Sequence, residues 1–98
     1  MIRHVVMFRW KEGVDDAHVQ ATAEALRALP GQIPEILSYS CGSDVGIAAT
    51  NFDFAVSALF AGTDEFVTYR DHPAHQAVVQ TLIGPHVTER CAVQFSEQ

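Results

Sequence analysis

Apolar residues alternate with other residues along several short segments of the chain, and this period of two is typical of β-strands. The first such segment runs from Ile2 to Trp10. One of its faces consists of Ile2, His4, Val6, Phe8 and Trp10. The other face is also apolar in its middle, because it carries Val5 and Met7. A strand covered on one side only would show polar residues on its second face, so we expect both sides to be covered.

Three further segments have strand character. The clearest runs from Phe52 to Ala61 and again has two apolar faces, with only Ser57 interrupting the second one. A weaker strand is predicted from Ile36 to Gly42, and a last strand from Val87 to Ser96. The chain therefore supplies enough strands for one small sheet.

Between the first two strands, apolar residues recur at helical spacing and predict an amphipathic helix. The stripe consists of Val19, Ala23, Leu26 and Leu29 or Pro30. The side chain of Asp15 or Asp16 can cap this helix by accepting a hydrogen bond from a free backbone N–H at the N-terminus, where the helix dipole is positive. Pro30-Gly31 predicts its end, because proline is not tolerated in a helix interior and glycine permits the turn.

A second helical region precedes the last strand and is broken by a proline. Thr63 is expected to cap a short helix. That helix should end near His72, because the residue before a proline avoids helical geometry. Pro73 suits the first turn of a second segment, which we expect to stop at Gly84-Pro85.

The predicted order is strand, helix, strand, strand, helix, strand, within one domain that covers residues 1–98. This βαββαβ order predicts an α+β, ferredoxin-like antiparallel sheet with both helices on one face. The helices then leave the second apolar side of the sheet uncovered. We therefore predict a homodimer through the open sheet face.

Composition and charge exclude several classes of protein. The net charge is −6, with no basic cluster, which argues against nucleic-acid binding. No apolar run approaches the roughly 20 residues that a membrane-spanning helix needs, so no membrane association is predicted. Cys41 and Cys91 lie in predicted strands, where two buried free thiols are expected. The N-terminal residues lack an export signal pattern, and we expect a cytoplasmic protein.

Several motifs occur in an order that is typical of one family. His4 to Lys11 lies in the first strand, Gly42-Ser43-Asp44 follows the second, Phe60 lies at the end of the third, and Tyr69 precedes His72-Pro73-Ala74-His75. In this order they resemble the stress-responsive dimeric α+β barrel (Dabb) proteins over nearly the whole chain. The resemblance implies a single Dabb-like domain, a homodimer whose sheets form a barrel, and a cavity between sheet and helices in each subunit.

The family includes polyketide cyclases of the olivetolic acid cyclase type, in which a helix histidine and a tyrosine act on a poly-keto chain without a cofactor. By resemblance, His75 corresponds to that histidine and Tyr69 to that tyrosine, with His72 and His4 near the cavity. One position departs from the pattern. Such cyclases can place a second strand histidine in the cavity, whereas the third strand here offers Phe54. We therefore do not expect the same substrate.

His75 and Tyr69 are also the residues whose chemistry fits such a site. His75 lies three and four residues before Val78 and Val79, so helical spacing places it on the inward stripe. A neutral imidazole can accept a proton, as aldol or enolisation chemistry requires. A phenol can donate a hydrogen bond to a carbonyl oxygen as negative charge develops there. The alternative is that both are buried polar groups bonded to their neighbours.

His4 and His72 are candidates for secondary contacts with the same ligand. His4 shares a strand face with apolar residues and must find a polar partner there. His72 precedes the proline and can instead bond backbone freed at the helix break. His18 and His86 are expected to be solvated and receive no role. The apolar residues expected to shape the substrate pocket are Phe8, Phe54, Val79 and Leu82.

No metal site is predicted, although His72 and His75 are three residues apart beside Asp71. Structural zinc normally takes four ligands at paired spacings, and Pro73 interrupts the helix that would align the two histidines. Neither a dinucleotide-binding glycine motif nor a phosphate loop occurs, so no cofactor is predicted.

Three functions are compatible with these observations. The first is a cofactor-free protein that binds a hydrophobic keto compound and acts as a cyclase, lyase or isomerase with His75 as base. The second is a non-catalytic, stress-related homodimer in which the histidines are structural and the cavity is small or closed. The third is a cofactor-free monooxygenase, since small enzymes of that kind share the fold. One fold hosts unrelated chemistries, so the site has to distinguish them.

Overall fold

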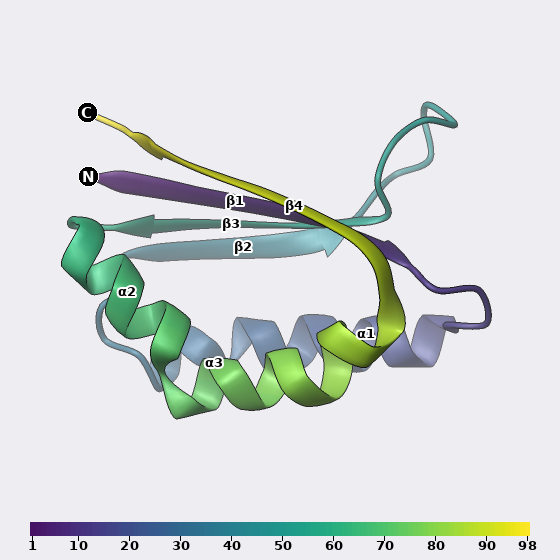
Figure 1. Ribbon diagram of the computed structural model, residues 1–98, viewed down its shortest axis with the longest axis horizontal. Coiled ribbons are helices and arrows are strands. Elements are labelled where there is room, and N and C mark those ends of the chain that lie inside the picture. Colours follow the sequence, from purple (N-terminus) through teal and green to yellow (C-terminus); the bar gives the residue numbers. More distant parts are fainter.

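Figure 1 shows a computed structural model of residues 1–98, in which the helices lie on one face of a four-stranded sheet. The strand order is β2-β3-β1-β4, and every neighbouring pair is antiparallel. The predicted ferredoxin-like α+β fold is therefore confirmed. The elements are β1 (Ile2–Trp10), α1 (Asp16–Arg27), β2 (Ser38–Ser43), β3 (Phe54–Phe60), α2 (Thr63–Asp71), α3 (Pro73–Val78) and β4 (Val87–Ser96).

Helix α1 begins as predicted and ends earlier than predicted. The side chain of Asp15 accepts a hydrogen bond from the backbone N–H of His18 at 2.9 Å, which satisfies one of the free donors of the first turn. The helix ends at Arg27, and Pro30 lies in the separate 3-10 turn Leu29–Gly31. The α-helix therefore stops before the proline, which occupies an early position of the 3-10 turn.

The junction between α2 and α3 lies at His72, as predicted. His72 has extended backbone, and its Nδ1 accepts a hydrogen bond from the N–H of Ala74 at 3.0 Å. The expectation that Thr63 caps α2 is wrong. The first backbone bond of the helix runs from the N–H of Phe66 to the carbonyl of Gly62, so Gly62 occupies the cap position and Thr63 is already helical.

After α3 the chain continues through the π-helical segment Val79–Ile83 and the 3-10 turn Gly84–His86. The predicted stop at Gly84-Pro85 thus marks the end of a widened turn and not of a regular α-helix. A π-turn holds more residues per turn than an α-helix, so side chains beyond Val79 are rotated from their α-helical directions. Periodicity in the sequence does not report this change.

The bounds of two strands differ from the prediction. β2 begins at Ser38 and not at Ile36, because the N–H of Ile36 bonds the carbonyl of Ile33 within a turn. β3 begins at Phe54 and ends at Phe60, within the predicted segment from Phe52 to Ala61. β1 and β4 have the predicted bounds.

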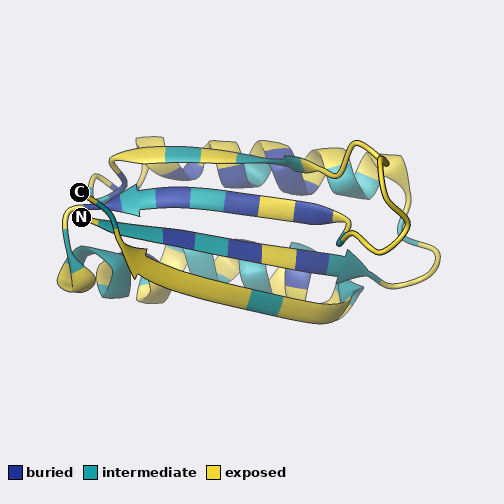
Figure 2. Ribbon diagram, turned by 90° about the horizontal axis from the view of Figure 1, so that it is seen from above, coloured by how far each residue is buried: buried dark blue, intermediate teal, exposed yellow.

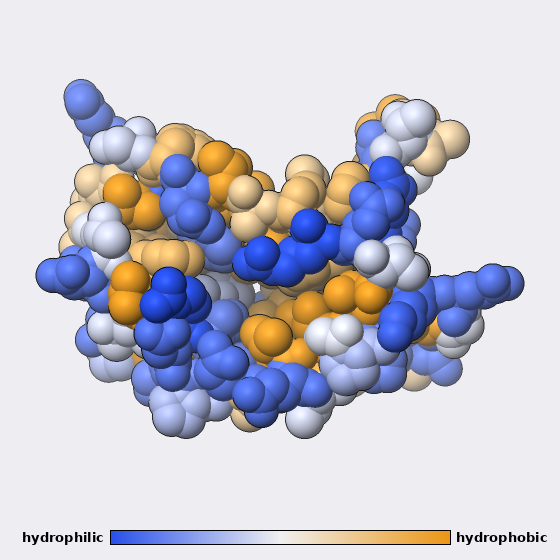
Figure 3. Space-filling model, in the orientation of Figure 1, coloured by the Kyte–Doolittle hydropathy of each residue, from blue (hydrophilic) through white to orange (hydrophobic).

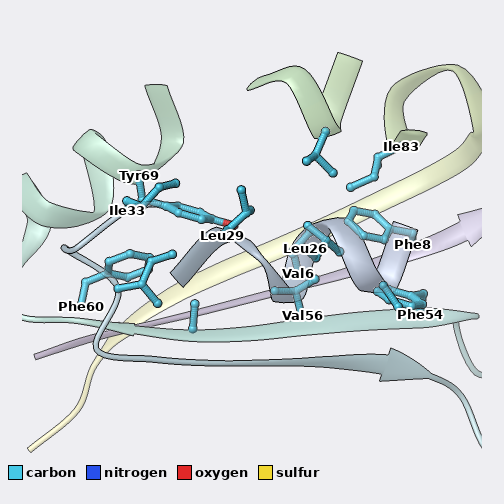
Figure 4. Close-up of a cluster of buried hydrophobic side chains, with 14 residues drawn as sticks. Val6, Phe8, Leu26, Leu29, Ile33, Phe54, Val56, Phe60, Tyr69 and Ile83 are labelled. Carbon is cyan, nitrogen blue, oxygen red and sulfur yellow. The ribbon is translucent and has the colours of Figure 1, made fainter. Parts of the chain in front are cut away.

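The core lies between the sheet and the helices. Figure 2 shows buried residues concentrated on the central strands β1 and β3, while β4 is exposed along most of its length. In Figure 4, Tyr69, Ile33 and Phe60 gather at one end of the core, and Phe8, Phe54 and Ile83 gather at the other. The helices thus cover one face of the sheet, as the strand pattern predicted.

The other face of the sheet remains open and apolar. Antiparallel register places Val5 opposite Val93 and Met7 opposite Cys91 on this face. Met7 is 37% exposed, Val93 55% and Phe95 46%. We call the set Val5, Met7, Cys91, Val93 and Phe95 the open-face patch.

Both cysteines are free thiols, as expected, but neither is fully buried. Cys41 is half-buried, and its Sγ lies 3.9 Å from the carbonyl oxygen of Ala23 in α1. Cys91 is half-buried on the open face, because that face has no cover from its own chain. No helix in the structure has both the length and the apolar character needed to cross a membrane.

Candidate functional site

A cavity of about 280 Å³ lies between the sheet and the helices. Figure 3 shows this side of the molecule hollowed, with apolar atoms inside the hollow and hydrophilic residues along its rim. All four strands and all three helices contribute to its wall. The lining residues are His4, Val6, Phe8, Leu26, Tyr39, Val56, Phe66, Tyr69, Arg70, His75, Gln76, Val79, Ile83, Gly84, Val87 and Arg90.

Two phenols meet at one end of the cavity. The hydroxyls of Tyr39 in β2 and Tyr69 in α2 lie 2.9 Å apart, and Tyr69 is only 2% exposed. Burial raises the pKa of Tyr69 to about 12, and it also raises the pKa of Tyr39. Both phenols therefore stay protonated at neutral pH. One donates to the other, which leaves the second O–H free to donate to a ligand.

His75 lies beside this phenol pair, with its ring centroid 4.2 Å from that of Tyr69. Its Nδ1 is 2.9 Å from the carbonyl oxygen of Arg70. A carbonyl can only accept, so Nδ1 carries the hydrogen and Nε2 carries the lone pair of the neutral ring. Burial lowers the pKa of His75, which favours that neutral ring. Nε2 has no partner within the protein, and no buried side-chain nitrogen lacks one, so Nε2 is accessible.

The neutral ring of His4 carries its hydrogen on the other nitrogen than His75 does, so its Nε2 is a donor. It is 4% exposed, and its Nδ1 lies 2.8 Å from the side-chain amide nitrogen of Gln94 in β4. Because that nitrogen donates, Nδ1 accepts and the hydrogen of the neutral ring resides on Nε2. Burial, assisted by the positive charge of Arg90, lowers the pKa of His4 to about 4. The cavity thus combines one basic nitrogen, on His75, with hydrogen-bond donors from His4 and the phenol pair.

Five of the sequence-predicted site residues line this cavity: His75, Tyr69, His4, Phe8 and Val79. They come from β1, α2, α3 and the π-helical segment, and the fold brings them together. Their roles toward a ligand stay predictions.

Three predicted contacts do not line the cavity: His72, Phe54 and Leu82. The Nδ1 of His72 is engaged in capping α3. Phe54 packs in the core against Phe8 and Trp10, with ring centroids 6.2 and 5.8 Å away. Leu82 lies in the π-helical segment, where it is half-buried and packs against the core cluster.

His18 and His86 are not the free, solvated groups that the sequence suggested. Their rings lie 4.0 Å apart, and the Nε2 of His18 is 2.8 Å from the carbonyl oxygen of Leu82. The edge of Trp10 also packs on His18. This cluster ties α1 to the π-helical segment and lies outside the cavity lining.

Sequence reasoning missed four polar residues that line the cavity: Tyr39, Arg70, Gln76 and Arg90. A signal existed for Tyr39, which alternates with Cys41 on one face of a predicted strand. No local pattern reveals Arg90, because its place depends on the register that pairs it with Phe8 across β1 and β4. Across the whole chain, no group of three or more His, Cys, Asp or Glu side chains is arranged to hold a metal ion.

Comparison with known proteins gives consistent matches over most of the chain. A family model described as "Stress responsive A/B Barrel Domain" (Dabb) matches residues 2–97. An uncharacterised protein of Streptomyces coelicolor is 40% identical over 81 residues, which span 81% of this chain and 84% of that protein.

Solved structures show the same fold. A dimeric ferredoxin-like protein of unknown function from Thermobifida fusca is 45% identical with a TM-score of 0.91, covering 98% of this chain and 90% of that one. A hydroxynitrile lyase from Passiflora edulis is 18% identical with a TM-score of 0.83, covering 96% of this chain and 90% of its own. The similarity to the hydroxynitrile lyase is one of fold alone. The similarity to the Thermobifida fusca protein, which is described as dimeric, supports a homodimer here.

Proposed function

Because this chain belongs to the stress-responsive A/B barrel domain (Dabb) family, we propose that it binds a hydrophobic keto compound in the cavity between sheet and helices. We further propose that it acts on this compound without a cofactor, as a polyketide cyclase-like lyase or isomerase. His75 is the base, and the phenol pair of Tyr69 and Tyr39 receives the carbonyl oxygen. His4 supplies a further donor.

One observation carries this proposal: the same cavity is lined by an imidazole with an accessible basic nitrogen and by a phenol pair with one O–H free to donate. Nε2 of His75 can remove a proton from the carbon next to a ketone. The electron pair of that C–H bond then moves to the carbonyl oxygen, where a phenol O–H stabilises the developing charge. The proton held on His75 is returned to carbon or to a leaving oxygen, so the protein ends unchanged.

The cavity also favours this function over the non-catalytic alternative. A closed cavity beside His75 would favour a non-catalytic protein, whereas the space there amounts to about 280 Å³ and is walled mainly by apolar groups. This volume lies near the lower end for small-molecule sites. The hydroxynitrile lyase with this fold is an example of lyase chemistry on the same scaffold.

The open-face patch is the proposed dimer interface. Its exposed apolar residues lie on the sheet face opposite the helices, and the loop between β2 and β3 projects on that same side (Figure 1). This loop carries Val45 and Ile47, which are 81% and 86% exposed. A second copy packed on this face would cover the patch and bring these loop residues against its edge.

Proton removal can be measured directly, without knowledge of the natural substrate. We would follow deuterium uptake at the carbons next to the ketone of 4-phenylbutan-2-one in D2O by proton NMR. The variant His75→Gln removes the base and is expected to slow protein-dependent exchange by about 100-fold or more. The matched control is His72→Asn, which lies outside the cavity and retains a capping side chain.

The control should exchange at the wild-type rate. Exchange at the wild-type rate by a folded His75→Gln protein would remove His75 from the role of base. Circular dichroism and thermal unfolding of both variants establish that they are folded.

A further inference from the structure

The mouth of the cavity is marked by the lining residues that are exposed to solvent. Among all lining residues only Arg70, Gly84 and Arg90 are exposed, and the remainder are buried or half-buried. The exposed part of the lining therefore carries two arginines, and no other charged residue. Whether these arginines are available to it depends on their partners within the protein.

The two arginines differ in this respect. Arg70 forms a two-pronged ion pair with Asp71, with nitrogen to oxygen distances of 2.9 and 3.1 Å. The guanidinium of Arg90 makes no hydrogen bond and no ion pair with any residue of the chain. The other arginines are engaged as well: Arg3 with Glu97, Arg9 with Glu89, and Arg27 with the carbonyl of Cys41. Arg90 is thus the one guanidinium without a protein partner, in a chain of net charge −6.

The register of the sheet aims Arg90 toward the reactive groups. Arg90 pairs with Phe8, and Gln94 pairs with His4, so both β4 residues lie on the helix-facing side of the sheet. Gln94 bonds His4 at 2.8 Å. Arg90, His4 and His75 line the same cavity. In agreement with this, the charge of Arg90 lowers the pKa of both histidines. An exposed cationic residue thus shares the cavity wall with the proposed base.

We propose that Arg90 binds the carboxylate of the cavity ligand, so that the ligand is an anionic keto acid whose apolar body fills the cavity. This inference rests on the proposed function and adds the charge of the substrate to it. A guanidinium has a planar fork that matches a carboxylate in two hydrogen bonds. The carboxylate would stay at the mouth while the keto group reaches the phenol pair and His75.

A carboxylate fits better than a phosphate. Phosphate sites usually combine several donors, such as a helix N-terminus with additional cations. Here a single free guanidinium stands at the mouth, and the paired charge of Arg70 is already neutralised by Asp71. One planar anion matches one planar cation.

The test compares two probes that differ only in charge: 4-oxo-4-phenylbutanoate and its amide, 4-oxo-4-phenylbutanamide. Dissociation constants are measured by isothermal titration calorimetry at low and at high salt. The wild-type protein should bind the carboxylate at least about tenfold more tightly than the amide, since hydrogen bonds to charged groups are the stronger ones. High salt should reduce that preference.

Two matched variants localise the effect. Arg90→Gln should abolish the preference for the carboxylate and leave the affinity for the amide unchanged. Arg70→Gln, at the same mouth, should keep the preference, because its charge is already paired. A preference that survives in Arg90→Gln, or that disappears in Arg70→Gln, overturns the assignment to Arg90.

The outcomes separate this inference from the proposed function. Equal binding of both probes by the wild-type protein overturns the role of Arg90 and leaves a cavity that takes neutral ketones. If the wild-type protein binds neither probe, both the keto-compound function and this inference are overturned. Loss of the preference in Arg90→Gln alone supports both.

Discussion

Both faces of the sheet carry alternating apolar residues, but one face is buried under the helices and the other is exposed. On the covered face, Phe60 is fully buried under the helices, and the apolar wall encloses polar groups such as His75. On the open face, Phe95 and Val93 remain about half exposed. Each face needs a cover, and the chain supplies only one.

The open face also has the composition of an interface. Its apolar centre is the open-face patch, and ion pairs lie toward its two ends, Arg3 with Glu97 and Arg9 with Glu89. An apolar centre within a polar rim is the usual arrangement where two proteins meet. The faces therefore differ in what covers them: the helices of the same chain cover one side, and a second copy is the cover that we propose for the other.

The largest expected effect comes from a matched pair of phenylalanines, one on each face. Phe60→Ala removes a fully buried ring and should lower the free energy of unfolding by about 3–5 kcal/mol at every protein concentration. Phe95→Ala should cost little where the monomer prevails and more where the dimer forms, because unfolding of a dimer depends on protein concentration. Urea unfolding at two concentrations measures both. Equal, concentration-independent costs would contradict the contrast between the faces.

A charge placed on the open face should separate the dimer. Val93→Asp puts a carboxylate into the open-face patch, where burial without a partner costs several kcal/mol. We expect the dimer dissociation constant to rise by about 100-fold or more, as seen by light scattering. Ala21→Asp adds the same charge on an exposed position of α1 and should leave the assembly unchanged. A dimer that persists in Val93→Asp would move the interface to another surface.

A smaller effect is expected from pH, and it acts through the covered face. The folded protein holds the pKa of His4 at about 4, below the ordinary 6.5, so between these values the unfolded chain binds a proton that the folded chain does not. Stability should therefore fall as pH falls from 6.5 towards 4. Between pH 7 and pH 4.5 we expect His4 to account for a loss of about 2–3 kcal/mol. The lowered pKa of His75 acts in the same direction.

Chemical unfolding at both pH values, at one protein concentration, tests this expectation. His4→Gln cannot titrate at this position and should lose less stability than the wild type on acidification. An unchanged pH dependence in His4→Gln would show that other groups cause it.

Local chemistry in the sequence determined the order of the elements, the two apolar faces of β1 and β3, and the break at His72 and Pro73. These features depend on alternation, helical spacing and the geometry of proline, which act between residues close together in the chain. The same local patterns placed His75 on the inward side of its helix and His4 on the inward side of its strand, where both line the cavity.

Tertiary structure decided which distant groups meet. The hydrogen bond between Tyr39 and Tyr69, the contact of Gln94 with His4, and the free guanidinium of Arg90 at the mouth follow from strand register and helix docking. Leu82 likewise packs against the core cluster and does not line the cavity, although regular helical spacing predicts that it should. These arrangements depend on packing between residues far apart in the chain, and such contacts produce no local pattern in the sequence. The sequence thus indicated a histidine on an apolar wall, and only the folded chain showed the second phenol and the cation that line the same cavity.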